Sequence, residues 1–599
     1  MVQREKKVRA GVAAGATGAL VAASALVALA AAPSATAAVG NPYEGATQYV
    51  NPDWREDVLE AADVAGGSLG EDMRAIADEP TFVWMDRIQA IEGIDRQHGL
   101  EWHLDQAVAQ AGSSPLVFNI VIYDLPGRDC FALASNGELP ATDEGMERYK
   151  TEYIDAIVEI LDRPEYENLR ISAVIEPDSL PNMVTNMSHQ PCQEAAPYYR
   201  EGVRYALDRL HEVGNVYSYI DAAHSGWLGW PDNASGSAQE FASVVEGSTY
   251  GWDAVAGFVT NTANSTPLEE PFLTNPNLQV GSGQVRSAEY YEWNPDFDEI
   301  DWTADLYDRM VAQGAPSRIG MLIDTSRNGW GGSERPTSVS SSSDLNTYVN
   351  ESRVDRRTHR GAWCNPDGAG IGERPTVSPS GYAESHLHAF VWVKPPGESD
   401  GASEEIPNDE GKSFDRMCDP TYQADKLGGA YTGALPNAPL SGWWFQDQFE
   451  MLVANAYPPI GDGGPDPDPT DDPTDDPTDD PTDDPTDDPT DDPTDDPTDD
   501  PGTGDCVATL EVVNDWGSGF QGQITVTGGS GGTSGWTTQF TLPTGTTIGS
   551  LWNADYSVNG STVTASDVGW NGTLNAGQST SFGFTANGTA PSSTAVTCS

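Results

Sequence analysis

The sequence is poor in basic residues, with 30 Lys and Arg against 92 Asp and Glu and a formal net charge of −62. A chain this acidic is repelled by polyanions, which argues against nucleic acid or an anionic membrane as its partner. Beyond its N-terminal region the sequence also lacks an apolar run long enough to span a bilayer. It contains neither a CxxC nor an HExxH motif, so we expect no metal site and no cofactor.

Cysteine is scarce too, and the N-terminus indicates how the few cysteines are used. Basic residues from Arg4 to Arg9 precede an Ala-rich apolar stretch that ends in Ala35-Thr36-Ala37. This pattern is typical of a secretory signal peptide, residues 1–37, cleaved near Ala37. In an exported chain, six widely spaced cysteines suggest three disulfides. We therefore expect a secreted, extracellular monomer.

Residues 462–505 separate two regions of different composition. Pro-Thr-Asp-Asp occurs eight times from Pro469 to Asp500, without an apolar residue. Proline keeps such a segment extended and the aspartates repel one another, so we expect a disordered spacer. It divides the chain into a large region, 41–461, and a small one, 506–599.

The large region alternates apolar β-type runs with helical patterns. An amphipathic stretch has Met146, Tyr149, Tyr153, Ile157 and Leu161 at helical spacing, and another runs from Tyr198 to Val213 and stops at Gly214. The alternation predicts an α/β fold whose parallel strands are covered by helices, either a closed barrel or an open doubly wound sheet. The expected strands are Thr81–Asp86, Leu116–Asp124, Arg170–Ile175, Val216–Asp221, Ala254–Thr260, Arg318–Asp324 and Ala389–Lys394.

Asp178 follows the third of these strands, in Val-Ile-Glu-Pro-Asp-Ser-Leu (174–180), where Pro177 ends the apolar run. A carboxyl group at the tip of a buried strand loses hydration and tends to stay protonated, as a general acid must. Taken alone, an Asp here is better explained by a turn. However, other polar residues also follow strands, and the C-terminal ends of parallel strands are where α/β folds place their sites. These residues are Asp124, Asp129, Asp221, His224, Asn264 and Asp400.

Paired carboxyl groups and tryptophans near the same strand ends together suggest sugar chemistry. Glycoside hydrolysis uses one carboxylic acid to protonate the leaving oxygen and a second carboxylate to attack or to activate water. A carboxyl group close to Asp178, such as Asp129, would raise its pKa by repulsion. Pyranose rings stack on aromatic faces, and four tryptophans lie in loops or at strand ends. A single tryptophan is more often part of a core, but Trp84, Trp227, Trp230 and Trp363 accompany the same carboxylates.

Several blocks of the large region resemble glycoside hydrolase family 6, in order and over nearly its whole length. They are Tyr-Val-Asn-Pro-Asp-Trp (49–54), Tyr-Asp-Leu-Pro-Gly-Arg-Asp-Cys (123–130), Ala-Ser-Asn-Gly-Glu (134–138), the block around Asp178, Asp-Ala-Ala-His-Ser-Gly-Trp-Leu-Gly-Trp (221–230) and Trp-Val-Lys-Pro-Pro-Gly-Glu-Ser-Asp-Gly (392–401). The resemblance implies a distorted, seven-stranded parallel β/α barrel that hydrolyses β-1,4-glucan with inversion.

The resemblance also implies roles for individual residues. Asp178 matches the proton donor, and Asp129 the partner that raises its pKa and orders water. Asp400 matches the candidate base, with a water chain through Ser135 as the alternative. Asp221 and Tyr123 match further site residues. The substrate-binding positions are Trp84, Asp86, His224, Trp227, Trp230, Asn264, Trp363, Lys394 and Glu398, and the implied disulfides are Cys130–Cys192 and Cys364–Cys418. Phe131 departs from the family pattern, where a small residue is expected.

Three long stretches after strand ends bear on the mode of attack: 262–296, 327–382 and 400–440. Long ordered loops in a compact domain usually act as lids. Lids over a barrel would form a tunnel, as in the bacterial cellobiohydrolases of the family, which release cellobiose from non-reducing ends. The alternatives are an endoglucanase with an open cleft and a non-catalytic cellulose-binding protein. Four site carboxylates argue against the last.

The small region contains no Lys or Arg and consists of short alternating segments: Gln523–Thr527, Thr537–Leu542, Thr562–Ala565 and Thr580–Thr585. Such alternation with intervening turns predicts an antiparallel β-sandwich. Cys506 and Cys598 lie near its two ends, so we expect them to pair. The region resembles a family 2 cellulose-binding module. By that resemblance, Trp516, Trp552 and Trp570 form the cellulose-binding face and Trp536 belongs to the core.

Overall fold

The computed structural model describes residues 40–461, except 95–96 and 409, and most of 506–599. Within the second range, 516–518, 530–531, 544, 569–570, 575–577, 592–595 and 599 are not described. The described residues belong to two compact units. The predicted signal peptide and the predicted spacer lie outside the described residues. Among the described residues, no helix is long and apolar enough to cross a bilayer.

The first unit is built on a curled sheet of seven consecutive parallel strands, each at a predicted position. They are β2 (Val83–Met85), β5 (Leu116–Ile122), β6 (Arg170–Ile175), β7 (Val216–Asp221), β8 (Gly257–Thr260), β11 (Gly320–Asp324) and β13 (Leu387–Val391). Short strands extend its ends: β1 (Thr47–Gln48) pairs with β5 in parallel, and β12 (Thr376–Val377) pairs with β13 antiparallel.

The sheet curls until its first and last parallel strands meet. Phe82 N donates to Trp392 O at 3.2 Å, and Trp84 Nε1 donates to Val393 O at 2.8 Å. The sheet is therefore a distorted barrel whose seam lies between β2 and β13, which settles the choice that the sequence pattern left open.

Both faces of the strands are buried, which explains their continuous apolar runs. Along β5, Val117 and Val121 pack inside the barrel with Tyr219 and Leu322. The alternate residues Phe118, Ile120 and Ile122 pack outward against the helices. The helices are α1 (Pro52–Ala65), α2 (Gly67–Ala75), α3 (Leu100–Ala111), α4 (Asp143–Arg148), α5 (Asp155–Leu161), α6 (Ser179–Thr185), α7 (Gln190–Val213), α8 (Ser225–Leu228), α9 (Pro231–Glu246), α10 (Glu299–Ala312), α11 (Leu345–Ser352) and α12 (Gln446–Ala454).

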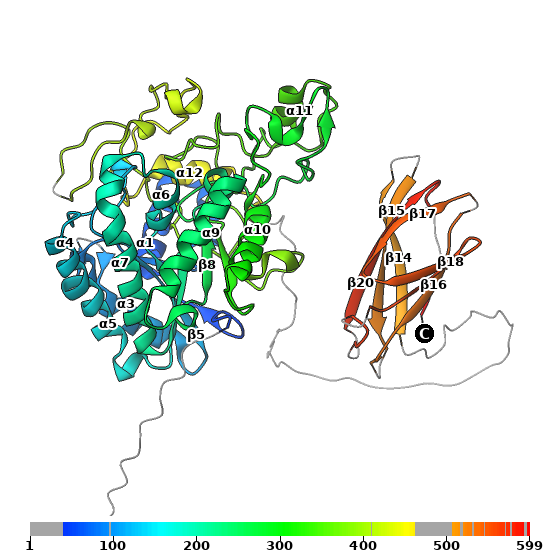
Figure 1. Ribbon diagram of the computed structural model, residues 1–599, viewed down its shortest axis with the longest axis horizontal. Coiled ribbons are helices and arrows are strands. Elements are labelled where there is room, and N and C mark those ends of the chain that lie inside the picture. Colours follow the sequence, from blue (N-terminus) through cyan, green and yellow to red (C-terminus); the bar gives the residue numbers. More distant parts are fainter. Residues whose placement is uncertain are drawn as a thin grey trace, which may run out of the picture. The chain divides into compact units, whose positions relative to one another are not determined.

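Both predicted helical stretches are helical. A π-helical turn, Tyr149–Ile154, joins α4 to α5 and completes the amphipathic element. The second stretch, α7, begins earlier than expected and ends before Gly214, which adopts φ 89°. Figure 1 shows α7, α9 and α10 lying over the strands.

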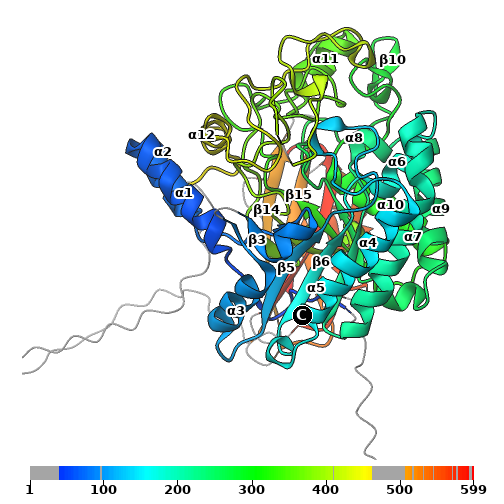
Figure 2. The same cartoon turned by 90° about the vertical axis from the view of Figure 1, so that its left-hand side faces the viewer.

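The loops after the strand ends carry structure of their own. The hairpin of β9 (Gln279–Val280) and β10 (Gly283–Gln284) and helix α11 enclose a small apolar cluster that includes Leu273, Tyr291 and Val349. Figures 1 and 2 place α11 at the same end of the unit as α12, and Figure 2 shows α8 at this end too. A second hairpin, β3 (Gly93–Ile94) and β4 (Gln97–His98), follows β2. The long loops are thus folded.

The second unit consists of two antiparallel sheets around one core, as predicted. One contains β14 (Cys506–Asp515), β15 (Gly519–Gly528), β20 (Ser579–Asn587) and β17 (Thr547–Trp552); the other contains β18 (Asp555–Asn559), β19 (Thr562–Ser566), β16 (Thr537–Thr541) and β21 (Thr597–Cys598). Trp536 is buried and stacks on Phe582, with ring centroids 5.4 Å apart, which confirms its place in the core. Trp516 and Trp570 lie outside the described residues.

Candidate active site

Strained backbone marks the C-terminal ends of four neighbouring strands. Non-glycine residues with positive φ follow β5, β6, β7 and β8: Asp129 (53°), Glu176 (50°), Asp178 (63°), Ala223 (51°), Asn261 (61°) and Ala263 (54°). Each such residue costs about 1–3 kcal/mol and persists only where its surroundings over-determine it, as at functional sites. The strain therefore falls where the sequence predicts the site.

Asp178 lies at the tip that follows β6 and precedes α6. Its backbone N donates to Asp221 Oδ2 at 2.9 Å, which fixes the left-handed turn. Burial, followed by the negative charges of Asp129, Asp221 and Asp400, raises the pKa of Asp178 well above its ordinary value. Asp178 is thus a carboxylic acid that keeps its proton, which it could donate.

Asp129 is held from two sides in the loop after β5. The Tyr123 hydroxyl donates to Asp129 Oδ2, and Ser135 is a further hydrogen-bond partner of this carboxyl group. Burial raises the pKa of Asp129, against the opposing effect of the Arg128 guanidinium. Burial also raises the pKa of Asp221 to about 6. Three interacting carboxyl groups therefore share the site, and they do not all ionise together.

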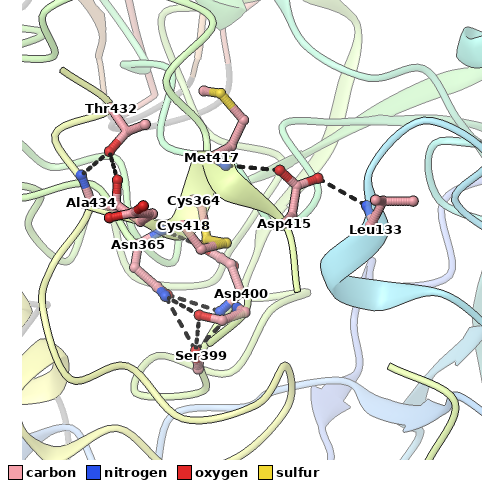
Figure 3. Close-up of a disulfide and its surroundings, with 12 residues drawn as sticks. Leu133, Cys364, Asn365, Ser399, Asp400, Asp415, Met417, Cys418, Thr432 and Ala434 are labelled. Atoms are coloured by element: carbon pink, nitrogen blue, oxygen red, sulfur yellow. Dashed lines mark hydrogen bonds between the residues drawn. A yellow bond between two sulfur atoms is a disulfide. The ribbon is translucent and has the colours of Figure 1, made fainter. Parts of the chain in front are cut away.

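Asp400, after β13, has a different environment. Arg327 Nη1 donates to both of its oxygens at 2.9 and 3.0 Å, and Asn365 N donates to Asp400 Oδ2 at 2.8 Å. Figure 3 shows Asp400 beside Asn365 and the Cys364–Cys418 disulfide. Arg327 and Asn365 were not predicted. Arg327 follows a strand end, as the predicted site residues do, so its position could have identified it. Asn365 lies far along a loop, where the sequence carries no such signal.

These carboxyl groups border a cavity of about 420 Å³. Eleven predicted site residues line it: Trp84, Tyr123, Ser135, Asp178, His224, Trp227, Trp230, Asn264, Trp363, Lys394 and Asp400. Of the other predicted residues of this unit, Asp129, Asp221 and Glu398 contact residues of the cavity wall, whereas the Asp86 carboxylate contacts Arg87 and Lys412, which do not line the cavity. Asp129 and Asp221 contact Tyr123 and Asp178, as described above. Glu398 Oε2 lies 3.5 Å from Lys394 Nζ, while Asp86 pairs with Arg87 at 3.0 Å and lies 3.7 Å from Lys412 Nζ. Phe131, Arg360 and Lys426 line the cavity without having been predicted as binding residues.

The family model for glycosyl hydrolases family 6 matches residues 43–456, and the model for the cellulose binding domain matches residues 506–599. The chain belongs to glycosyl hydrolases family 6. Both resemblances seen in the sequence are thereby confirmed.

Two relatives are similar in sequence to about 70% of this chain. Exoglucanase A of Cellulomonas fimi is 62% identical over 441 residues, which is 72% of this chain but only 51% of that protein. The chain thus spans about half the length of that relative. Exoglucanase 3 of Agaricus bisporus is 35% identical over 70% of this chain and 80% of its own.

Solved structures of family 6 match the fold. The catalytic domain of Cellulomonas fimi Cel6B superposes with a TM-score of 0.70 at 62% identity, covering 72% of this chain and 98% of that one. Cellobiohydrolase II (Cel6A) of Humicola insolens, in complex with glucose and cellotetraose, gives a TM-score of 0.55 at 34% identity, covering 70% and 100%.

In this family 6 chain, two loops that both contribute residues to the cavity wall also contact each other. Leu133 N donates to Asp415 Oδ2 at 2.9 Å, and Ser413 N donates to Leu133 O at 3.2 Å, so the loop after β5 contacts the loop after β13 (Figure 3). The Lys426 ammonium lies 4.9 Å from the centre of the Phe131 ring. The cysteines form the three expected pairs, Cys130–Cys192, Cys364–Cys418 and Cys506–Cys598.

The loops after β8 and β11 are joined as well. The Glu270 carboxylate accepts from Val354 N at 2.6 Å and from Asp355 N at 3.1 Å. Arg360 Nη2 donates to Ser225 Oγ at 2.7 Å and to Asp296 O at 3.0 Å. In the part of the chain that the structure describes, no group of three or more His, Cys, Asp or Glu is arranged to hold a metal ion.

Proposed function

We propose that the protein is a secreted, exo-acting cellulase that hydrolyses β-1,4-glucosidic bonds with inversion and releases cellobiose from non-reducing chain ends. The observation that carries the proposal is a cavity lined by tryptophans, with a protonated Asp178 on its wall and with wall loops that are hydrogen-bonded to each other. Relatives named exoglucanase at 62% and 35% identity support the same activity.

In this proposal, Asp178 donates its proton to the glycosidic oxygen as the bond from that oxygen to the sugar's anomeric carbon breaks. The raised pKa keeps Asp178 protonated until the leaving oxygen needs the proton, and the positive charge that develops on the sugar then favours its release. Asp129 raises the pKa of Asp178 and, with Ser135 and Tyr123 around it, orders the attacking water.

The attacking water must lose a proton, and Asp400 is the proposed acceptor. Its contacts with Arg327 and Asn365 occupy part of the lone-pair capacity of the carboxylate, so the remaining positions are few. The water's proton reaches Asp400 directly or through a chain of waters past Ser135. Because inversion needs room for a water, we expect the carboxyl groups of Asp178 and Asp400 to stand about 6.5–9.5 Å apart in the working enzyme.

Substrate binding in this proposal depends on rings more than on charge. Trp84, Trp227, Trp230 and Trp363 present aromatic faces to successive pyranose rings, and Lys394 and Asn264 supply hydrogen bonds to hydroxyl groups. The small unit, 506–599, holds the enzyme on cellulose, and residues 462–505 act as the spacer to the catalytic domain, 41–461.

The exo mode is tested on filter paper and carboxymethyl cellulose together. We expect mostly soluble reducing ends, chiefly cellobiose, from filter paper and little loss of viscosity from carboxymethyl cellulose, because chains must thread beneath the joined loops. A rapid viscosity drop with many insoluble ends would show that the loops open, and would replace the exo assignment by an endoglucanase. Nuclear magnetic resonance of the first product tests inversion: the α-anomer should appear before mutarotation.

A further inference from the structure

Trp293 is an exposed tryptophan in a loop whose other large rings are buried. It lies between β10 and α10 and is 60% exposed, while its neighbours Tyr290, Tyr291 and Phe297 are at most 8% exposed. A single exposed apolar residue needs no explanation. The exposure of Trp293 does need an explanation, because its backbone is held in an unfavourable conformation and its loop is hydrogen-bonded to the cavity wall.

The backbone keeps this indole in place at a cost. Glu292 and Trp293 both adopt positive φ, 48° and 73°, which is unfavourable for side chains of this size. Trp293 N donates to Arg286 O at 2.6 Å, and Tyr291, two residues earlier, stacks on Phe297 with ring centroids 3.8 Å apart. The exposed ring is therefore presented by an anchored turn, and ordering it on a ligand costs little entropy.

The same turn is attached to the wall of the cavity. Trp230, which lines the cavity, donates from Nε1 to Glu292 O at 2.9 Å. The Glu292 carboxylate lies 3.6 Å from His359 Nε2, and the next residue, Arg360, also lines the cavity. Trp293 thus follows directly on a residue that is hydrogen-bonded to Trp230, which places its backbone next to the aromatic wall of the cavity.

We propose that Trp293 is an outer glucan-binding platform, which stacks on a pyranose ring of the incoming cellulose chain beyond Trp230. An indole face suits the C–H face of a glucose ring. The Arg286 guanidinium, 5.9 Å from the centre of the Trp293 ring, is close enough to contribute hydrogen bonds to sugar hydroxyls. This inference rests on the proposed function, since it extends the same binding path outward.

The test is Trp293→Ala in the full-length protein, with hydrolysis measured on soluble cello-oligosaccharides of increasing length. Soluble chains are used because binding of the small unit to solid cellulose would hide the effect. For cellotetraose we expect an unchanged kcat/KM. For chains long enough to reach beyond Trp230, we expect KM to rise about 3- to 10-fold at nearly constant kcat, the value of one aromatic contact. Trp293→Phe should restore most of the loss.

Tyr250→Ala is the matched control. Tyr250 is 38% exposed and packs against His211, with ring centroids 4.3 Å apart. It precedes β8 and hence lies at the opposite end of the strands from the site. It should leave KM unchanged for every chain length. If Trp293→Ala behaves like this control, or lowers kcat/KM equally for all lengths, the platform is overturned. Failure of the proposed function would look different, since the unmutated protein itself would then not hydrolyse cellotetraose.

Discussion

The two units of the chain differ in whether they bury charged side chains. The first unit buries charges: Arg327 against Asp400 and Arg357 against Asp355, each side chain at most 5% exposed. The second unit has no Lys or Arg in its sequence, and its core consists of apolar residues such as Trp536, Phe582 and Ile524. Proton transfer needs charges fixed in a dry setting, whereas stacking on a neutral polymer needs none.

Fixing charges has a structural cost that the second unit avoids. Taking a carboxylate out of water costs several kcal/mol unless partners compensate it. The first unit therefore surrounds Asp400 with Arg327 and Asn365, and leaves Asp178 protonated. Hydrolysis and cellulose binding should thus be separable, each lost without the other.

The largest effect should come from Asp178→Asn. The amide has the shape of the acid but no acidic proton, so we expect turnover of unactivated glucan to fall by about 10²- to 10⁴-fold. Adsorption to cellulose should stay within about twofold of the unmutated protein, because the second unit is untouched. Hydrolysis rates and adsorption isotherms on the same preparation measure both. Unchanged turnover would remove Asp178 from its role, and lost adsorption would break the division between the units.

The two units also differ in the hydrophobic pattern from which their strands could be predicted. Continuous apolar runs predicted all seven barrel strands, because β5, β6 and their neighbours are buried on both faces and end at polar residues. Alternation predicted the sandwich, because strands such as β15 and β19 have one buried face. These are local signals, and they fix where Asp178, Asp221 and Asp400 must converge.

What could not be predicted depends on contacts between residues far apart in the chain. Leu133 N donates to Asp415, and Val354 N donates to Glu270. These residues lie in loops whose sequences show neither a helical nor a strand-like hydrophobic pattern. Likewise Asn365 could not be foreseen as a partner of Asp400, because its position in a loop carries no sign of what it will face. Charge compensation in the first unit is thus a tertiary property.

A smaller effect should follow from Trp552→Ala in the second unit. The resemblance to cellulose-binding modules predicts that this ring binds cellulose together with Trp516 and Trp570. Loss of one stacked ring should weaken adsorption to crystalline cellulose by about 3- to 10-fold and leave kcat/KM on cellotetraose unchanged. Tyr556→Ala is the control, since Tyr556 is 46% exposed in β18 of the other sheet. Equal losses in both variants would argue against a specific binding face.

The smallest effect should be a shift in pH dependence caused by Asp221→Asn. Asp221 Oδ2 accepts from Asp178 N, and an amide oxygen can still accept there, so the turn should survive. The substitution removes one of the negative charges that raise the pKa of Asp178. A lower pKa means that Asp178 loses its proton at lower pH, so the alkaline limb of kcat/KM should move to lower pH. Burial, the largest cause of the raised pKa, remains, and the limb should stay above that of an ordinary Asp.

The measurement is the normalised kcat/KM profile on cellotetraose, with Asp208→Asn as the control. Asp208 accepts from Thr249 at the far end of the barrel, so removing its charge should leave the limb in place. An alkaline limb that does not move in Asp221→Asn would mean that it reports another group. A limb that moves equally in both variants would mean that the net acidity of the whole surface, rather than the cluster around Asp178, sets it. Only a shift confined to Asp221→Asn ties the pH dependence to the buried charges that distinguish the first unit from the second.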